Sequence, residues 1–305
     1  MRAKKISAVL GAVLLSVVAV SCGSGDSSSG STQAPAETDA VAETNAPEAT
    51  DAPAETGAPA ETEPVVVDAN LVEGITIDGD AADWADVPVL DLTLDAIVDV
   101  TAESKDASVK VAHDGENVMV LIQVEDDYNW DPDDAHLSAA LGVQWAIDQS
   151  AGDAMGATED DQETSLGMVD IWHWELECEA GVVAGGSTSG PGEGNDAGND
   201  EACNFDDEWS TDTETREDDN GEGAENSLAG AWSHSEPVAD ADGTWTFEMS
   251  RPFDTGDSTD TTFVIGSSNQ MAVAYWDSDV SPEGWEDEDH VQSTGIGWIV
   301  VNLVG

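Results

Sequence analysis

Positive charge is scarce in this chain of 305 residues, which has 7 Lys and Arg against 66 Asp and Glu and a formal net charge of −59. Beyond residue 22, the basic side chains are Lys105, Lys110, Arg216 and Arg251. Such a surface repels phosphate backbones, which argues against nucleic acid as a partner. It suits high salt or divalent cations, because both screen the repulsion among the acids. The alternative is that the acids only keep an exposed surface soluble.

The short motifs of common catalytic sites are also missing. The sequence has no Gly-rich phosphate loop, no nucleophile elbow and no His-Glu-x-x-His pattern. Three of its histidines, His113, His136 and His234, lie in predicted turns or loops with no partner that the sequence places. Acid pairs are too abundant to single out a glycosidase dyad. We therefore expect no catalytic activity from this chain by itself.

Only one long apolar run is present, and it lies at the N-terminus. It follows a basic start and ends at Cys22, which is typical of a secretory signal peptide. The run is short for a spanning helix, which needs ~20 apolar residues. Ala19-Val-Ser-Cys22 resembles a lipoprotein signal, although the usual leucine before the cysteine is absent. Cys22 would then be lipidated and hold an exported protein at the cell surface or in the periplasm; an uncleaved anchor is the alternative.

Cysteine is rarer still, and two cysteines remain after Cys22. An even pair in an exported chain, Cys178 and Cys203, predicts a disulfide that closes the Gly-rich loop between them. Residues 23–64 have no aromatic side chain and repeat Ala, Pro, Glu and Thr, so we expect a disordered tether there. Function should therefore lie in residues 65–305.

Residues 65–305 are predicted to be all-β. Short segments rich in Val, Ile, Trp, Phe and Thr alternate with turn signals such as Asp78-Gly79 and residues 113–117. No segment has a long helical period, so we expect an antiparallel β-sandwich of the jelly-roll or DOMON-like kind. Residues 180–230 are acidic, Gly-rich and poor in apolar side chains, which favours a loop excursion.

The stretch Met168-Val-Asp-Ile-Trp-His-Trp-Glu175 is the most aromatic of these segments. Because alternate residues of a strand face opposite sides, Met168, Trp172 and Trp174 should share one face and His173 the other. That face could be a layer of the core or the wall of a site. A histidine on an apolar face is more often a hydrogen-bonded core residue than a ligand.

Several blocks of this region resemble a known family when they are taken in order. These blocks are "VQWAID", "MVDIWHWE", "GTWTFEMSRPFDTGD", "AVAYWDS" and "STGIGWIVVNLV". They are similar to the haem-binding domain of the ethylbenzene dehydrogenase gamma subunit and to the haem subunits of dimethyl sulfoxide reductase-like enzymes. The earlier stretch "ITIDGDAADWADVP" resembles the start of family 9 carbohydrate-binding sandwiches. Together these blocks cover most of residues 70–305 outside the acidic insertion.

The resemblance implies a β-sandwich that holds one non-covalent haem b between a methionine and a lysine. Such a domain would exchange electrons with the catalytic or iron–sulfur subunit of a molybdenum enzyme. The absence of a Cys-x-x-Cys-His motif agrees with non-covalent attachment. The family methionine matches Met168, with Met155 as the rival, and Trp172 and Trp174 would line the haem pocket.

The family lysine has no counterpart here, because "SPEGWEDEDHVQSTGIGWI" contains no Lys. His290 is the nearest nitrogen donor, and Met/His ligation would give a rather high reduction potential. The alternative is that haem is lost and His290 is an exposed loop residue. The chain would then be a non-haem surface module that binds carbohydrate or another extracellular ligand, with calcium as a possible structural ion.

A second group of candidate ligands lies in Asp126-Asp-Tyr-Asn-Trp-Asp-Pro-Asp-Asp134. Oxygen donors occur at every second position, as in calcium-binding loops: Asp127, Asn129, Asp131 and Asp133. The loop is not an EF-hand, since Pro132 replaces the required Gly and Ser138 replaces the bidentate Glu. The sequence therefore leaves two readings open, a calcium site and a solvated acidic turn.

Overall fold

A computed structural model describes the parts of the chain that build the sandwich. These parts are residues 64–96, 103–131, 137–155, 167–175, 186–189, 205–211, 217–218, 227–280, 284 and 290–305. The predicted signal peptide, Cys22, the tether, Asp133 and the predicted disulfide pair Cys178 and Cys203 lie outside these residues. No helix in the described ranges is long and apolar enough to cross a membrane.

The described residues form strands and two short 3₁₀ turns, which confirms the all-β prediction. The strands are β1 (Val65–Leu71), β2 (Leu90–Ala96), β3 (Lys105–His113), β4 (Asn117–Asp127), β5 (Ala140–Ala146), β6 (Val169–Glu175), β7 (Gly186–Ser189), β8 (Phe205–Ser210), β9 (Glu217–Asp218), β10 (Ala229–His234), β11 (Asp242–Pro252), β12 (Ser268–Trp276), β13 (Val291–Gln292) and β14 (Ile299–Val304). The 3₁₀ turns are η1 (Ala81–Trp84) and η3 (Ser293–Ile296).

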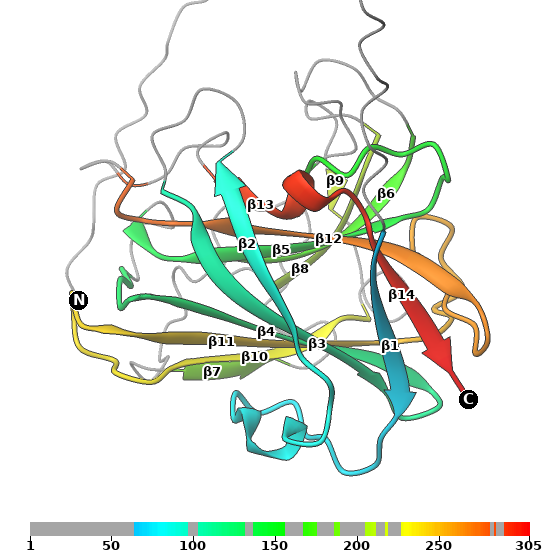
Figure 1. The fold of residues 1–305 in the computed structure, drawn as a ribbon, viewed down its shortest axis with the longest axis horizontal. Helices are drawn as coiled ribbons and strands as arrows, with labels where there is room; N and C mark the ends of the chain where they lie inside the picture. Colours follow the sequence, from blue (N-terminus) through cyan, green and yellow to red (C-terminus); the bar gives the residue numbers. More distant parts are fainter. Residues whose placement is uncertain are drawn as a thin grey trace, which may run out of the picture. The chain divides into compact units, whose positions relative to one another are not determined.

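The strands form two packed layers, as predicted for a sandwich (Figure 1). One layer runs β7-β10-β11-β4-β3, and the other runs β14-β12-β5-β6-β8-β9. Most neighbours are antiparallel, but β1 pairs in parallel with both β14 and β3. Together with the β2–β3 and β2–β13 pairs, β1 connects the two layers at one side. The fold is therefore a mainly antiparallel sandwich with a parallel junction.

The hairpin between β3 and β4 shows how local sequence determines this architecture. The predicted turn at residues 113–117 is present, and Gly115 has a φ of 98°, which favours glycine. The Asp114 carboxylate accepts hydrogen bonds from the backbone N–H of Glu116 at 2.8 Å and of Asn117 at 2.6 Å. These bonds stabilise the turn that fixes the register of the two strands.

The acidic insertion differs from the sequence-based prediction. The acidic region 180–230 contributes β7, β8, β9 and the start of β10, so it extends both layers instead of forming only a loop. Backbone hydrogen bonding to a sheet edge does not require apolar side chains, so alternation did not reveal these strands. The turn predicted at Asp78-Gly79 is present, and the Glu248 carboxylate of β11 holds it.

Glu248 is fully buried and accepts three hydrogen bonds from that turn. Its carboxylate oxygens accept from Asp78 N–H at 2.8 Å, Gly79 N–H at 2.5 Å and Trp84 Nε1–H at 2.5 Å. Burial raises the pKa of Glu248 against the opposing effect of these hydrogen bonds. The "DGDAADW" motif therefore acts as an anchor for the outer face of β11.

The interior between the layers is aromatic and contains one buried ion cluster. Arg251 of β11 is fully buried and donates from Nη1 to Asp170 Oδ1 at 3.0 Å and to Asp260 Oδ1 at 3.1 Å. Its Nη2 also donates to Asp170 Oδ2. The guanidinium carbon lies 5.1 Å from the ring centroid of Trp172. This cluster ties β6 of one layer to β11 of the other.

Candidate functional site

The two indoles predicted to line a haem pocket lie between the layers. Trp172 is fully buried, with its ring centroid 5.3 Å from that of Trp145 and 6.2 Å from that of Phe263. Trp174 lies 6.5 Å from Phe247, which belongs to the opposite layer. Both indoles therefore contribute to the main hydrophobic core, which was the alternative interpretation of this strand.

The structure does not bring Met168 and His290 together. Met168 precedes the first residue of β6, whereas His290 lies at the level of Trp276, which is in register with the far end of β6. At ~3.4 Å per residue, the length of β6 separates them by roughly 20 Å. Two axial ligands of one iron must both touch it, so this register does not support Met168 with His290 as a pair.

Met155, the rival methionine, does lie near His290, on the outer face of the β12-β5-β6 layer. We call Met155, His173, Trp276, His290 and Gln292 the outer-face cluster. The Trp276 ring centroid lies 4.8 Å from that of His290 and 5.1 Å from that of His173. His290 is only 3% exposed, so it is not an exposed loop residue.

Gln292 of β13 joins the thioether segment to the imidazole. Its Oε1 accepts a hydrogen bond from Met155 N–H at 3.0 Å and lies 3.3 Å from His290 Nε2. Because an amide oxygen only accepts, this contact requires the proton on Nε2 and leaves the lone pair on Nδ1. Gln292 Nε2 is buried and has no hydrogen-bond partner within the described residues.

Two residues of β5 hold Met155 against the sheet. Gln144 Nε2 donates to the carbonyl oxygens of Gly152 at 3.1 Å and Ala154 at 3.0 Å, which fixes the segment before Met155. At Gly142, an added Cβ would lie 3.0 Å from Met155 Cε and 3.2 Å from Trp276 Cζ3. Glycine at this position therefore lets the thioether and the indole meet over the strand.

His173 also belongs to this cluster, although the sequence favoured a hydrogen-bonded core residue at this position. It faces away from Met168, as predicted, but Met155 lies on its own side of the sheet. Its Nδ1 lies 3.7 Å from Glu208 Oε1, and both side chains are buried. One sequence signal for this outer site was present: alternation along "AVAYWDS" places Trp276 on the face of the strand opposite Tyr275.

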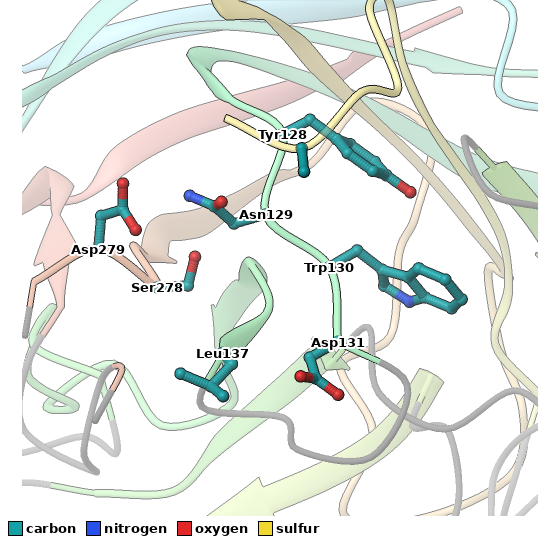
Figure 2. A pocket seen from close by; sticks show the side chains of 8 residues that line it. Tyr128, Asn129, Trp130, Asp131, Leu137, Ser278 and Asp279 are labelled. Atoms are coloured by element: carbon teal, nitrogen blue, oxygen red, sulfur yellow. The ribbon is translucent and has the colours of Figure 1, made fainter. Parts of the chain in front are cut away.

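A polar pocket of about 300 Å³ lies at another position, beyond the ends of β4 and β12 (Figure 2). Its lining residues are Tyr128, Asn129, Trp130, Asp131, Leu137, Ala239, Ser278 and Asp279. Two of the predicted calcium ligands, Asn129 and Asp131, line this pocket. Asn129 Nδ2 donates to Oδ2 of a third, Asp127, at 3.1 Å. Across the described ranges, no three His, Cys, Asp or Glu side chains group as a metal site.

Asp279 stands beside these residues although it is distant in sequence. Burial raises the pKa of Asp279, and the negative charges of Asp127 and Asp277 raise it further, while a hydrogen bond from Asn129 lowers it. Asp131 lines the same pocket, and its backbone N–H donates to Ser138 Oγ at 2.8 Å. The pocket thus gathers carboxylate, amide and hydroxyl groups from two strand ends.

A lysine-centred network lies next to this pocket. Lys105 Nζ lies 2.7 Å from Asp126 Oδ1 and 2.6 Å from Asp277 Oδ2, and Tyr275 Oη donates to Asp126 Oδ2 at 2.8 Å. Burial lowers the pKa of Lys105, but its bonds to the two carboxylates outweigh that effect and leave the pKa raised. Burial and the adjacent carboxylates raise the pKa of Tyr275 well above 10.

Comparison with known proteins gives one family and a set of distant structures. The sequence model of the family described as "Ethylbenzene dehydrogenase" matches residues 81–287, which is more than half of the chain. No curated protein is significantly similar to the chain.

Three of the similar structures have low sequence identity to this chain. A protein from Bacteroides uniformis, to which carbohydrate binding is provisionally ascribed, has 9% identity and a TM-score of 0.47, with 79% of this chain and 100% of that chain covered. A family 9 carbohydrate-binding module from Caldicellulosiruptor kristjanssonii, in complex with glucose, has 10% identity and a TM-score of 0.39, with coverages of 79% and 96%. A family 9 module from the same organism in complex with cellotriose has 11% identity and a TM-score of 0.38, with 79% of this chain and 94% of that chain covered.

Proposed function

Because the chain belongs to the ethylbenzene dehydrogenase family, we propose that it binds one haem b and transfers electrons outside the cytoplasm. Met155 and His290 are the iron ligands in this proposal. The observation that carries it is their meeting at one side chain, Gln292, on the outer face of the β12-β5-β6 layer. The chain is then a non-catalytic electron-transfer subunit.

The donor set of the outer-face cluster fits a haem iron. A thioether and an imidazole are a known axial pair, and they raise the reduction potential relative to two imidazoles. The apolar surface around them comes from Trp276, Ala140 and Ala274, which pack in the same cluster as Met155. The unpaired amide N–H of Gln292 is available to a polar group of the bound ligand.

The chain's own side chains would orient these ligands. Gln292 selects the His290 tautomer that keeps the Nδ1 lone pair, a role typical of residues behind an axial imidazole. Gln144 holds the backbone that leads to Met155. Haem supplies the one-electron redox couple, and the protein sets its potential through the ligands, burial and hydrogen bonds.

The partner and location complete the proposal. Membership of the family supports the catalytic or iron–sulfur subunit of a molybdenum enzyme as the electron partner. Export by residues 1–22 and lipidation at Cys22 would place the domain at the cell surface or in the periplasm, at the end of a tether. The acidic surface would then select a partner with a basic docking face.

Haem reconstitution of the mature chain tests the ligand assignment. We expect a Soret band that shifts on reduction, and we expect Met155→Leu or His290→Gln to change it to the spectrum of a haem lacking that ligand. Met168→Leu is the matched control and should leave the spectrum unchanged. The opposite result, with Met168 essential and Met155 dispensable, would refute the assignment. No Soret band at all, together with binding on a glycan array, would favour the non-haem binding module.

A further inference from the structure

We propose that the pocket of Figure 2 is a calcium site. Its ligands are Asn129, Ser278 and Asp279 of the lining, together with Asp127, which accepts a hydrogen bond from Asn129 beside the pocket. This inference does not depend on haem, since the outer-face cluster shares none of these residues. It revises the sequence prediction, because Ser278 and Asp279 join Asp127 and Asn129 in place of Asp131 and Asp133.

The donors come from the ends of two strands in different layers. Asp127 is the last residue of β4, and Asn129 follows it, whereas Ser278 and Asp279 follow the end of β12. Figure 2 shows the side chains of Asn129, Ser278 and Asp279 gathered on one side of the pocket. A cation bound here would add a further link between the two layers, next to the hydrogen bond from Tyr275 to Asp126.

The two carboxylates of the site are not neutralised by a basic side chain. The Asp279 carboxyl lies within hydrogen-bonding distance of the side chains of Asp127 and Asn129, and two carboxylates this close repel each other. Lys105 is the adjacent cation, but it is paired with Asp126 and Asp277. Asn129 Nδ2 donates to Asp127 Oδ2 at 3.1 Å, and this amide carries no charge. A divalent cation would remove this repulsion.

Ser278 provides an independent indication of a ligand. It is 5% exposed, lines the pocket, and its hydroxyl takes part in no hydrogen bond within the described chain. Its hydroxyl oxygen is not one of the fully buried polar atoms without a partner, so it can be reached from the pocket. Its oxygen faces the space beside Asn129 and Asp279 in Figure 2, where it can coordinate a cation.

The donor set favours calcium over other ions. Calcium takes carboxylate, amide and hydroxyl oxygens and waters in flexible geometry with 6–8 ligands, whereas Mg²⁺ needs a near-ideal octahedron. A pocket of about 300 Å³ has room for the waters that complete the shell. With only two carboxylates, we expect a weak site, with a Kd of roughly 10⁻⁴–10⁻³ M, as in extracellular modules.

Terbium luminescence of the mature, haem-free chain tests this site, because Trp130 lines the pocket and can sensitise a bound lanthanide. After treatment with EDTA, Tb³⁺ emission excited through tryptophan should saturate, and CaCl₂ should displace it in the 10⁻⁴–10⁻³ M range. Asp279→Asn should weaken calcium at least ~10-fold, as expected for the loss of one of two carboxylate ligands. Ser278→Ala should weaken it less.

Asp91→Asn is the matched control, since it removes the same charge from an exposed position on β2. If Asp279→Asn and Asp91→Asn behave alike, the cation only screens the surface and the proposal fails. Displacement by glucose or cellotriose in EDTA that depends on Asp279 would instead make the pocket a saccharide site, which also overturns it. Circular dichroism of each variant verifies folding. Failure of this test leaves the haem assignment intact, because the terbium and haem experiments test different residues.

Discussion

Replacing Arg251 by methionine tests whether the buried ion cluster stabilises the sandwich. Arg251 is fully buried and donates to Asp170, to Asp260 and, at 3.2 Å, to the carbonyl oxygen of Thr261. Methionine retains most of the apolar length of the side chain but removes every one of these donors. The two acids would then be buried without their cation.

Removing one partner of a buried pair destabilises a protein by about 3–5 kcal/mol, because the remaining charge has lost both water and its counterion. Domains of this size are stable by only about 5–15 kcal/mol, so the effect is a large part of the total. We expect Arg251→Met to lower the free energy of unfolding at pH 7 by about that amount.

The pH dependence of this loss identifies its cause. Burial already raises the pKa of Asp170 despite Arg251, and removing Arg251 raises it further. A carboxyl group whose folded pKa is raised contributes stability that is fully present below its unfolded pKa and is lost as pH rises through the folded value. The penalty of Arg251→Met should therefore be small near the unfolded value of 3.8 and grow toward neutral pH.

Urea unfolding in moderate salt, at pH 7 and at pH 4.5, measures both effects. Lys110→Met is the control, because it also removes a cation, and Lys110 Nζ donates only to the neutral carbonyl of Trp84 at 2.8 Å. We expect it to lose about 1 kcal/mol. The reasoning is refuted if Arg251→Met costs no more than this control at pH 7, or if its cost does not change with pH.

Two further predictions concern other buried acids and phenols. Glu248→Ala should lower the free energy of unfolding by about 2–4 kcal/mol, because three N–H donors of the 78–84 turn lose their acceptor. Urea unfolding measures this loss. The control is Glu73→Ala at an exposed position, which should have almost no effect. The raised pKa of Tyr275 gives stability that is present below pH 10 and lost as pH rises through the folded value. Its phenolate absorbance should therefore appear only with alkaline unfolding, and Tyr275→Phe should remove that component; ionisation in the folded domain near pH 10 would contradict the burial argument.

The strands of the core could be predicted from sequence because their side chains alternate. β3, β4 and β12 each place apolar residues on the inner face at every second position, and the turn at residues 113–117 carries its own signal. The same alternation correctly put Trp172 and Trp174 on one face of β6. Sequence alone did not decide whether that face was the core or a site wall, because both are apolar.

The candidate sites could not be predicted in full, since they depend on non-local pairing. Met155 lies outside any regular strand, and its segment is held to the sheet by hydrogen bonds with the side chains of Gln144, Gln292 and Trp298. Asp279 is distant in sequence from Asp127, so spacing could not associate them. Strand register, which is set by contacts between remote segments, also separated Met168 from His290.

The parallel junction at β1 has a mechanical consequence. β1 is hydrogen-bonded along Val65–Asn70 to β14, which is itself the last strand, and it also pairs with the end of β3. A pulling force that reaches the domain through the residues before β1 acts along this strand. It must shear the whole β1–β14 ladder at once instead of opening its bonds one after another. The strand that follows the predicted tether is therefore built to resist tension.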